Sequence, residues 1–262
     1  MINKIHTKPL IHCITNPISI NQCANAILAV GAKPIMAEHP KEVLEITKTA
    51  DALMLNIGNI TDARMEAMPI SLLEATKKNI PVVLDIVGIG CSSLRKEFVD
   101  KLLKNAVPRV IKGNYSEILA LYDEEYRSSG VDADSTISEK IAEKTAVSLA
   151  DRYNTIILAT GQKDIVTDGK RLVYVNNGTP QLSSVTGTGC MLGALSASYL
   201  ATDNSFDAVV YACAVLGISG ELSKTFAGSG TFMQKLMDKL STITKADMEK
   251  HLKKEERKID EV

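Results

Sequence analysis

The chain has 262 residues and carries 30 Lys and Arg against 31 Asp and Glu, which gives a formal net charge of −1. This balance argues against a protein that binds nucleic acid through a general positive field, so any basic pocket has to be local. Aromatic residues make up 4% of the chain and Trp is absent, which removes the usual stacking platform for single-stranded nucleic acid. The length allows one sizeable core, and we expect one domain over residues 1–262.

Targeting and redox signals are weak in this sequence. The first residues contain no apolar segment of the kind that a signal peptide requires, and no run approaches the roughly 20 apolar residues of a membrane span. The five cysteines are scattered and form no C-x-x-C pair or His/Cys cluster that would indicate zinc or disulfides. We therefore expect a cytoplasmic protein without a membrane partner.

In the first half of the chain, short apolar runs alternate with helical patterns. This alternation is typical of a mostly parallel sheet with helices on both faces. Gly31 is a natural stop for the first helix. The expected strands are 9–15, 33–37, 52–57, 82–87 and 109–111, and the expected helices are 19–30, 41–50, 62–79, 94–105 and 137–153.

The second half of the chain has a different pattern. Residues 155–159 and 163–175 form short strand-like runs with Gly-containing turns, which favours antiparallel hairpins. The sequence thus predicts an α/β fold of three layers, α/β/α, with an antiparallel extension at one edge of the sheet. The longest connecting loop is expected at 123–134. Four further helices are expected at 190–202, 206–226, 230–240 and 245–256, the last as a charged, solvated helix.

Polar residues stand at the ends of several predicted parallel strands. Asn56, Asp85, Lys112 and Thr160 each occupy such a position. Ligands of open α/β sheets bind beyond the carboxyl ends of the strands. These side chains are therefore predicted to meet along one rim of the sheet.

A glycine-rich segment, Val185-Thr-Gly-Thr-Gly-Cys-Met-Leu-Gly-Ala194, opens a helix of small residues. Gly187 and Gly189 allow a tight turn and a close approach to a ligand. The backbone N–H groups of Thr188, Gly189 and Cys190 would point out of the helix N-terminus, which carries about half a positive charge and binds anions. The segment predicts an enzyme that handles phosphate, with Cys190 facing the transferred group.

Phosphoryl transfer also needs a metal and cations on the phosphates. Asp85 and Glu117 are candidate Mg²⁺ ligands, because Mg²⁺ prefers carboxylates and water, although each could simply cap a helix or turn. Lys112, Thr160 and Asn114 are candidates on the nucleotide side, with an ordinary surface lysine and a turn residue as the alternatives for the first two. Asn114 and Glu117, spaced N-x-x-E, open a helix.

Three roles are open for Cys190. A helix N-terminus lowers the pKa of a thiol, whereas a neighbouring polyphosphate raises it. The residue could act as a base toward an attacking hydroxyl, as a covalent nucleophile, or as a small apolar residue at a helix start. Met36 is by its residue type more often a core residue than a ligand contact.

The ordered set of motifs resembles the hydroxyethylthiazole kinases, a branch of the ribokinase-like small-molecule kinases, and the likeness extends over nearly the whole chain. Most of that superfamily carries Asp where this chain has Cys190. Two further departures from the family pattern are Ile86, where Pro is usual, and Lys112, where Arg is common. The matching segments are His12-Cys-Ile-Thr-Asn16-Pro, 31–37, 55–58, 84–90, 111–117, 130–133, 159–161, 185–190, 228–232 and 240–243.

The resemblance implies phosphorylation of the hydroxyl of 4-methyl-5-(2-hydroxyethyl)thiazole by ATP with Mg²⁺, as in thiamine salvage. It also implies a homotrimer with active sites between subunits. A related kinase for another ring alcohol such as hydroxymethylpyrimidine, a hydrolase using Cys190, and a non-catalytic sensor of a thiamine precursor are the alternatives. The implied roles are Met36, Gly187, Asn16 and Asn21 for the thiazole; Lys112 and Thr160 for ATP; Asp85 and Glu117 for magnesium; Gly189 and Cys190 for the anion hole.

Overall fold

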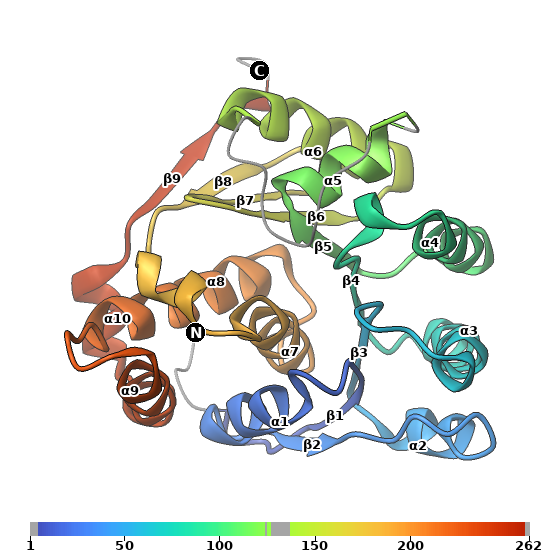
Figure 1. The fold of residues 1–262 in the computed structure, drawn as a ribbon, viewed down its shortest axis with the longest axis horizontal. Helices are drawn as coiled ribbons and strands as arrows, with labels where there is room; N and C mark the ends of the chain where they lie inside the picture. Colours follow the sequence, from blue (N-terminus) through green and yellow to red (C-terminus); the bar gives the residue numbers. More distant parts are fainter. Residues whose placement is uncertain (1–4, 124, 127–136, 260–262) are drawn as a thin grey trace.

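The computed structural model describes residues 5–123, 125–126 and 137–259, and within them one nine-stranded sheet runs through the molecule (Figure 1). The order is β2-β1-β3-β4-β5-β6-β7-β8-β9, parallel from β2 to β6 and antiparallel from β6 to β9. This confirms the expected fold class. The strands are β1 (Leu10–Ile14), β2 (Lys33–Ile35), β3 (Ala52–Asn56), β4 (Val82–Asp85), β5 (Val110–Asn114), β6 (Ile156–Thr160), β7 (Asp164–Thr167), β8 (Leu172–Val175) and β9 (Lys254–Arg257).

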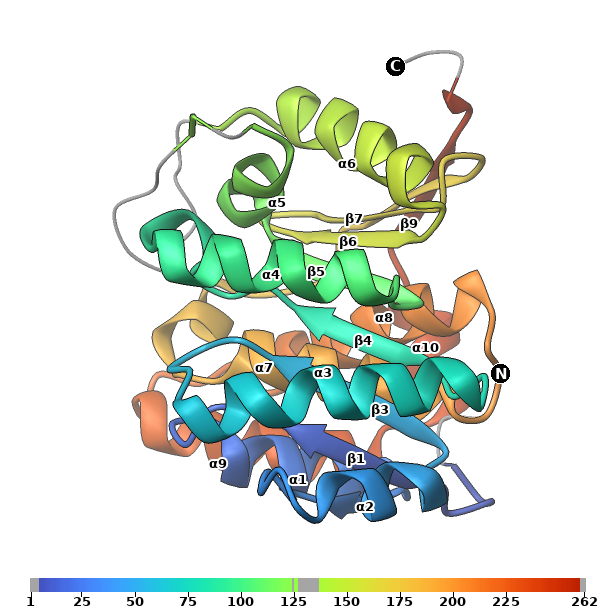
Figure 2. The ribbon, with the colours of Figure 1, turned by 90° about the vertical axis from the view of Figure 1, so that its right-hand side faces the viewer.

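Helices cover both faces of the sheet, α2 to α6 on one side and α1 with α7 to α10 on the other (Figures 1 and 2). The helices are α1 (Ile20–Ala29), α2 (Val43–Thr49), α3 (Asp62–Lys77), α4 (Ser93–Asn105), α5 (Tyr115–Tyr122), α6 (Glu139–Tyr153), α7 (Thr188–Leu200), α8 (Phe206–Leu222), α9 (Ser229–Thr242) and α10 (Lys245–His251), with short 3₁₀ turns η1 (Ile89–Cys91) and η2 (Pro180–Ser184).

The alternation of side chains along each strand decides which layer a residue serves. Leu53 and Leu55 of β3 pack in the core under α2 to α6, whereas Met54 packs in the core under α1, α7 and α8. Asn56 is two residues after Met54, so its side chain lies on the same face of the sheet and faces α7. Asp85 is two residues after Val83, which packs in the same core as Met54, so Asp85 also faces α7.

The central helix α7 packs on β3 and β4 with a glycine at the contact. A Cβ built on Gly193 would lie 2.8 Å from the Cε atom of Met54 and 3.7 Å from Oδ2 of Asp85. A larger residue at 193 would therefore require the end of the Met54 side chain to move. Gly193 thus allows Met54 and Asp85 to lie directly under the helix.

The C-terminal segment differs from the expectation of a helix over 245–256. Helix α10 ends at His251, and Lys254–Arg257 forms β9, which pairs antiparallel with β8. The charged pattern fits any solvent-facing element, and the free edge of β8 supplies backbone partners that a helix would leave unused. Arg257 also stacks over the ring of the buried Tyr174, 4.5 Å from its centroid. The 130–133 segment and most of the expected 123–134 loop lie outside the described residues.

Candidate active site

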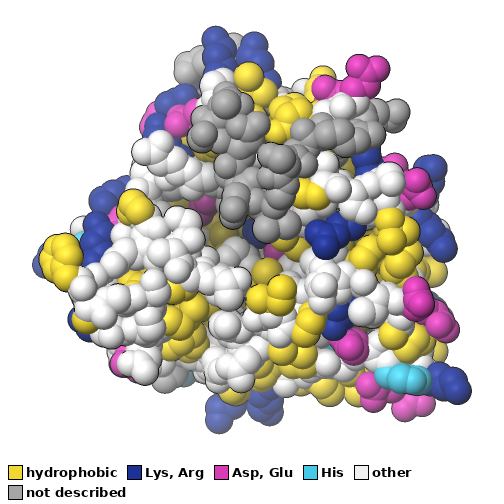
Figure 3. Space-filling view, in the orientation of Figure 1, with side chains coloured by type: hydrophobic (Ala, Val, Ile, Leu, Met, Phe, Trp, Pro, Cys, Tyr) yellow, Lys and Arg dark blue, Asp and Glu magenta, His cyan; other side chains and the backbone are white. Residues whose placement is uncertain are grey.

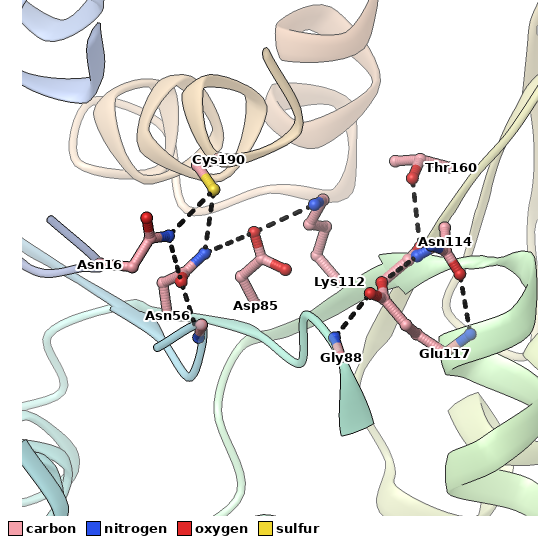
Figure 4. A network of polar contacts seen from close by, with 11 residues as sticks. Asn16, Asn56, Asp85, Gly88, Lys112, Asn114, Glu117, Thr160 and Cys190 are labelled. Atoms are coloured by element: carbon pink, nitrogen blue, oxygen red, sulfur yellow. Dashed lines mark hydrogen bonds and ion pairs between the residues drawn. The ribbon is translucent and has the colours of Figure 1, made fainter. Parts of the chain in front are cut away.

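Three adjacent parallel strands bring a polar row to the rim beside α7 (Figure 4). Asn56 of β3 is in register with Asp85 of β4, and Asp85 is in register with Lys112 of β5. The exposed fractions are 0%, 0% and 4%. Because register partners on one face of a sheet are neighbours, this row is fixed by the backbone pairing alone. The sequence-based expectation of a polar rim is confirmed for these residues.

Asp85 and Lys112 form a buried ion pair, with 3.0 Å between Oδ2 and Nζ. Burial raises the pKa of the Asp85 carboxyl, and the Lys112 charge opposes that rise. Burial alone would lower the pKa of Lys112, but the carboxylates of Asp85 and Glu117 outweigh it and the pKa is raised. Lys112 therefore carries its positive charge at neutral pH. It is paired with Asp85, and a bound phosphate could compete with Asp85 for the ammonium group.

Cys190 lies above this row and receives two side-chain amides. The Nδ2 groups of Asn16 and Asn56 donate to its Sγ atom at 3.4 and 3.3 Å. Burial, followed by the charge of Asp85, raises the pKa of the thiol. Cys190 is half-buried, so the sulfur has its amide contacts on one side and lies within reach of a ligand.

The N-terminus of α7 has the features expected from its glycines. Gly187 is the N-cap with φ +89°, and a Cβ at this position would lie 3.2 Å from the Cβ atom of Ser19. The first N–H groups of a helix lack partners within the helix. Thr188 turns its hydroxyl back to the Leu182 carbonyl at 2.8 Å, so only its backbone faces outward. A Cβ on Gly189 would lie 3.4 Å from Nζ of Lys112. The N-terminus of α7 and the ammonium group of Lys112 therefore border the same space.

Glu117 is held by the backbone. Its Oε2 and Oε1 atoms accept from the N–H groups of Asn114 and Gly88, each at 2.7 Å, and the Asn114 side chain caps the N–H of Glu117 at 2.9 Å. The expected helix start at Asn114 is confirmed as a capping box. Burial raises the pKa of Glu117 to about 7, although Lys112 pulls it down. Within the described residues, no three His, Cys, Asp or Glu side chains form a metal-binding group.

The remaining expected residues lie at different distances from this network. Thr160, at the end of β6, donates from Oγ1 to the Gly113 carbonyl at 3.4 Å and stays partly exposed. Met36 is half-buried against the core beside α7. Asn21 is exposed on α1, where its Oδ1 accepts from Asn25 at 2.8 Å. The structure thus places Asn16, Asp85, Lys112 and Cys190 in one network and leaves Asn21 outside it.

Asn56 is the residue whose part in the site sequence reasoning missed. It was expected on the rim, but no role was assigned to it. The signal was present in its position: a polar residue at the end of the strand next to the one that ends in Asp85. Which way its amide turns depends on contacts from β1, β4 and α7, which the sequence does not show.

The surface and the helices carry two further observations. On the face shown in Figure 3, Lys and Arg side chains are scattered among acidic ones and do not gather into one basic patch. Among the described residues, no helix combines the length and the apolar composition needed to cross a bilayer.

Comparison with known proteins agrees with this geometry. Residues 2–246 match the model of the "Hydroxyethylthiazole kinase family". Hydroxyethylthiazole kinase 2 of Clostridium botulinum is 46% identical over 242 residues, 90% of this chain and 91% of that protein. The structure of a hydroxyethylthiazole kinase from Pyrococcus horikoshii has a TM-score of 0.88 at 35% identity, covering 96% of this chain and 95% of that one. A ribokinase-like protein of Enterococcus faecalis shares the fold, with a TM-score of 0.62 at 12% identity over 89% of this chain and 86% of that one. This chain therefore belongs to the hydroxyethylthiazole kinase family.

Proposed function

We propose that this protein, as one catalytic domain, transfers the γ-phosphoryl group of ATP to the hydroxyl of 4-methyl-5-(2-hydroxyethyl)thiazole, giving the thiazole phosphate for thiamine salvage. One observation carries the proposal: the N-terminus of α7, with Cys190 in its first turn, stands directly over the buried Asp85–Lys112 pair. Phosphoryl transfer depends mainly on positioning and on charge stabilisation, and these elements supply both.

The transferred group would lie between the helix end and the lysine. The N–H groups of Thr188, Gly189 and Cys190 would donate to its oxygens, and the helix dipole favours the negative charge. Lys112 would turn from Asp85 toward the phosphates. Gly189 leaves the room for this movement, because a Cβ there would touch the ammonium group.

The acceptor hydroxyl would lie beside the half-buried sulfur of Cys190. Because burial and Asp85 raise the pKa of this thiol, little thiolate is available at neutral pH to act as a base. Positioning of the hydroxyl against the phosphoryl group therefore supplies most of the rate enhancement. Asn16 contacts the sulfur directly, and Gly187 and Met36 lie on the α7 side of the sheet where the thiazole ring would bind.

The carboxylates of Asp85 and Glu117 fit a magnesium ion that is bound jointly by the protein and by the phosphates of ATP. Mg²⁺ usually keeps several waters and takes only one or two protein carboxylates together with the phosphates. Asp85 Oδ2 already accepts from Lys112 and Asn56, but its Oδ1 is buried and has no hydrogen-bond partner among the described residues. Both oxygens of Glu117 accept backbone N–H groups, so Glu117 would act through water. Bound magnesium would neutralise charge on the transferring phosphoryl group.

Asn21 suggests how the site is completed. It lies on an exposed face of α1 together with Asn25 and Leu28, and the exposed Ile18 directly precedes the helix; these residues are spaced three and four apart. We infer that this face meets a second copy in a homotrimer and that Asn21 serves a pocket between subunits. None of the five cysteines, all of which lie in the described residues, forms a disulfide, and this agrees with a cytoplasmic enzyme. Sedimentation analysis tests the trimer, since a monomer at working concentration would contradict it.

The activity is tested by ADP release with ATP and Mg²⁺, alone, with hydroxyethylthiazole, and with hydroxymethylpyrimidine. Thiazole-dependent ADP release together with a phosphorylated thiazole by mass spectrometry supports the proposal. Stimulation by the pyrimidine alone would keep the fold and change the substrate. Absence of ADP with either alcohol, in folded protein that binds ATP, would reject the thiazole activity. Turnover without ATP and a trapped adduct on Cys190 would indicate a hydrolase.

A further inference from the structure

The side-chain amide of Asn56 has every hydrogen-bonding position filled. Its Nδ2 group donates to Asp85 Oδ2 at 3.0 Å and to Cys190 Sγ at 3.3 Å. Its Oδ1 atom accepts from Asn16 Nδ2 at 2.9 Å and from the Gly58 N–H at 3.0 Å. Two donors and two lone pairs are all that an amide offers. Asn56 is completely buried, so no water competes for these positions.

Only one orientation of this amide satisfies its neighbours. The Gly58 N–H can only donate, and the oxygen of an ionised Asp85 can only accept. A flipped Asn56 would set an N–H group against an N–H group and an oxygen against a carboxylate. The direction of the amide is therefore determined by the network and does not depend on an arbitrary assignment of oxygen and nitrogen.

Asn16 is fixed in the same manner and completes the contacts of the sulfur. Its Oδ1 accepts from the Ser19 N–H at 3.2 Å, which leaves its Nδ2 group to donate to Asn56 and to Cys190. A neutral thiol offers two weak acceptor positions and one weak donor. With both acceptor positions taken by Asn16 and Asn56, the S–H group of Cys190 is left for groups other than the two amides, either the Ser19 hydroxyl, which also faces the sulfur, or a ligand on the open side of the site.

We propose that Asn56 is a positioning residue for phosphoryl transfer, holding the Cys190 sulfur and the Asp85 carboxylate in one rigid frame. It fixes the sulfur beside the place where the acceptor hydroxyl would lie. It also occupies Asp85 Oδ2 together with Lys112, so that Oδ1 remains available. The kinetic part of this inference rests on the proposed function, whereas the placement of the thiol does not.

Two substitutions test the donor side of the amide. Asn56→Asp keeps the size and the oxygen that accepts from Gly58 and Asn16, but replaces the donor to Cys190 and Asp85 by a second oxygen. Asn56→Ser removes both amide N–H donors and leaves a single hydroxyl on a shorter side chain, with space around it. In both variants kcat is expected to fall by about 10- to 100-fold, the loss typical of a misplaced reacting group, while KM for ATP and for the alcohol changes less than about threefold.

Asn177→Ala is the matched control. Asn177 is also a buried asparagine, with its amide bonded to the His251 carbonyl, the Lys253 N–H and Glu221, none of which belongs to the site network. This variant is expected to lower the melting temperature and to keep kcat within about twofold of the wild type, as a residue without contact to the reacting groups should. A kcat loss in folded Asn56→Asp and Asn56→Ser no larger than in this control would overturn the proposal. If one of the two does not fold, the other decides.

A second readout does not depend on the substrate. A short pulse of iodoacetamide, followed by peptide mass spectrometry, gives the labelling of Cys190 relative to the exposed Cys91. Loss of the amide donor removes an N–H group that stabilises the reactive thiolate, so Asn56→Asp should lower this ratio at least about threefold. An unchanged ratio would reject the placement of the thiol by Asn56. If the wild type does not phosphorylate the thiazole alcohol, the proposed function fails and this ratio alone decides the inference.

Discussion

Asp85, the last residue of β4, and Glu117, in the first turn of α5 directly after β5, are two buried carboxylates at one rim of the sheet, and they are held in different ways. Asp85 accepts from the side chains of Lys112 and Asn56, and one of its oxygens has no partner among the described residues. Glu117 accepts from two backbone N–H groups and forms part of a helix cap. Side-chain donors can rotate toward a ligand, whereas backbone N–H groups cannot move without a change in the fold. The comparison assigns exchangeable contacts to Asp85 and a fixed position to Glu117.

The largest effect is expected for Asp85→Ala. The variant removes the one carboxylate with an available oxygen and weakens the dependence on Mg²⁺. Loss of such an electrostatic contact lowers kcat by about 100- to 1,000-fold. It also leaves Lys112 buried without its partner, which costs on the order of 3 kcal/mol of stability. Kinetics over a Mg²⁺ titration and urea unfolding measure the two effects.

Asp85→Asn separates the charge from the shape in this experiment. The amide fills the same space, so packing against α7 is retained while the carboxylate is lost. If both variants keep wild-type kinetics, Asp85 is not part of the reaction and the comparison with Glu117 is wrong.

Glu117→Gln is expected to lower both stability and activity less than Asp85→Ala does, because it does not leave Lys112 without its ion-pair partner. A glutamine sets an NH₂ group against the N–H of Gly88 or Asn114, and an unsatisfied buried donor costs about 1–3 kcal/mol. The residue acts on the reaction only through its charge and through water. Urea unfolding measures the loss of stability, and kcat measures the loss of activity. A kcat loss equal to that of Asp85→Ala would show that Glu117 is exchangeable as well.

The raised pKa of Glu117 makes the free energy of unfolding dependent on pH. Because this pKa is about 7 in the folded chain against an ordinary 4.5, the folded state binds the proton more tightly than the unfolded state. The resulting stability is complete below pH 4.5 and is lost as the pH rises through about 7, an effect on the order of 3 kcal/mol. The free energy of unfolding of the wild type should fall between pH 5.5 and 7.5, and the fall should be smaller in Glu117→Gln.

Asp164 contributes in the same direction, since burial also raises its pKa to about 7. Asp164→Asn is therefore the reference for a carboxylate of similar pKa that we assign no part in the reaction. Equal pH slopes in the wild type and in Glu117→Gln would contradict the assignment to Glu117.

The fold followed from local patterns, and so did the membership of the rim. Strand–helix alternation indicated the parallel sheet, and the N-x-x-E spacing indicated the cap at Asn114. What distinguishes Asp85 from Glu117 could not be predicted, because it depends on register across β3, β4 and β5 and on how closely α7 approaches. Asn56 was missed as a working residue for the same reason. The segment 254–257 was expected to be helical because its charges fit both elements, and only the free edge of β8 favours a strand.

The smallest effects are expected at Cys190, and they test whether the site uses a thiol or only a group at that place. Asn16 and Asn56 present two N–H donors there, which suit a carboxylate better than a sulfur. Cys190→Asp should therefore keep kcat within about tenfold of the wild type, even though it adds a charge near Asp85. Because the raised pKa of the thiol leaves little thiolate to act as a base, Cys190→Ala should cost less than the roughly 100-fold that a general base supplies. Complete loss of turnover in Cys190→Asp, with ATP and the alcohol still bound tightly, would show that the reaction needs sulfur itself. The amides of Asn16 and Asn56 would then serve to hold a thiol in particular, since a carboxylate at the same position would offer them better acceptors without supporting turnover.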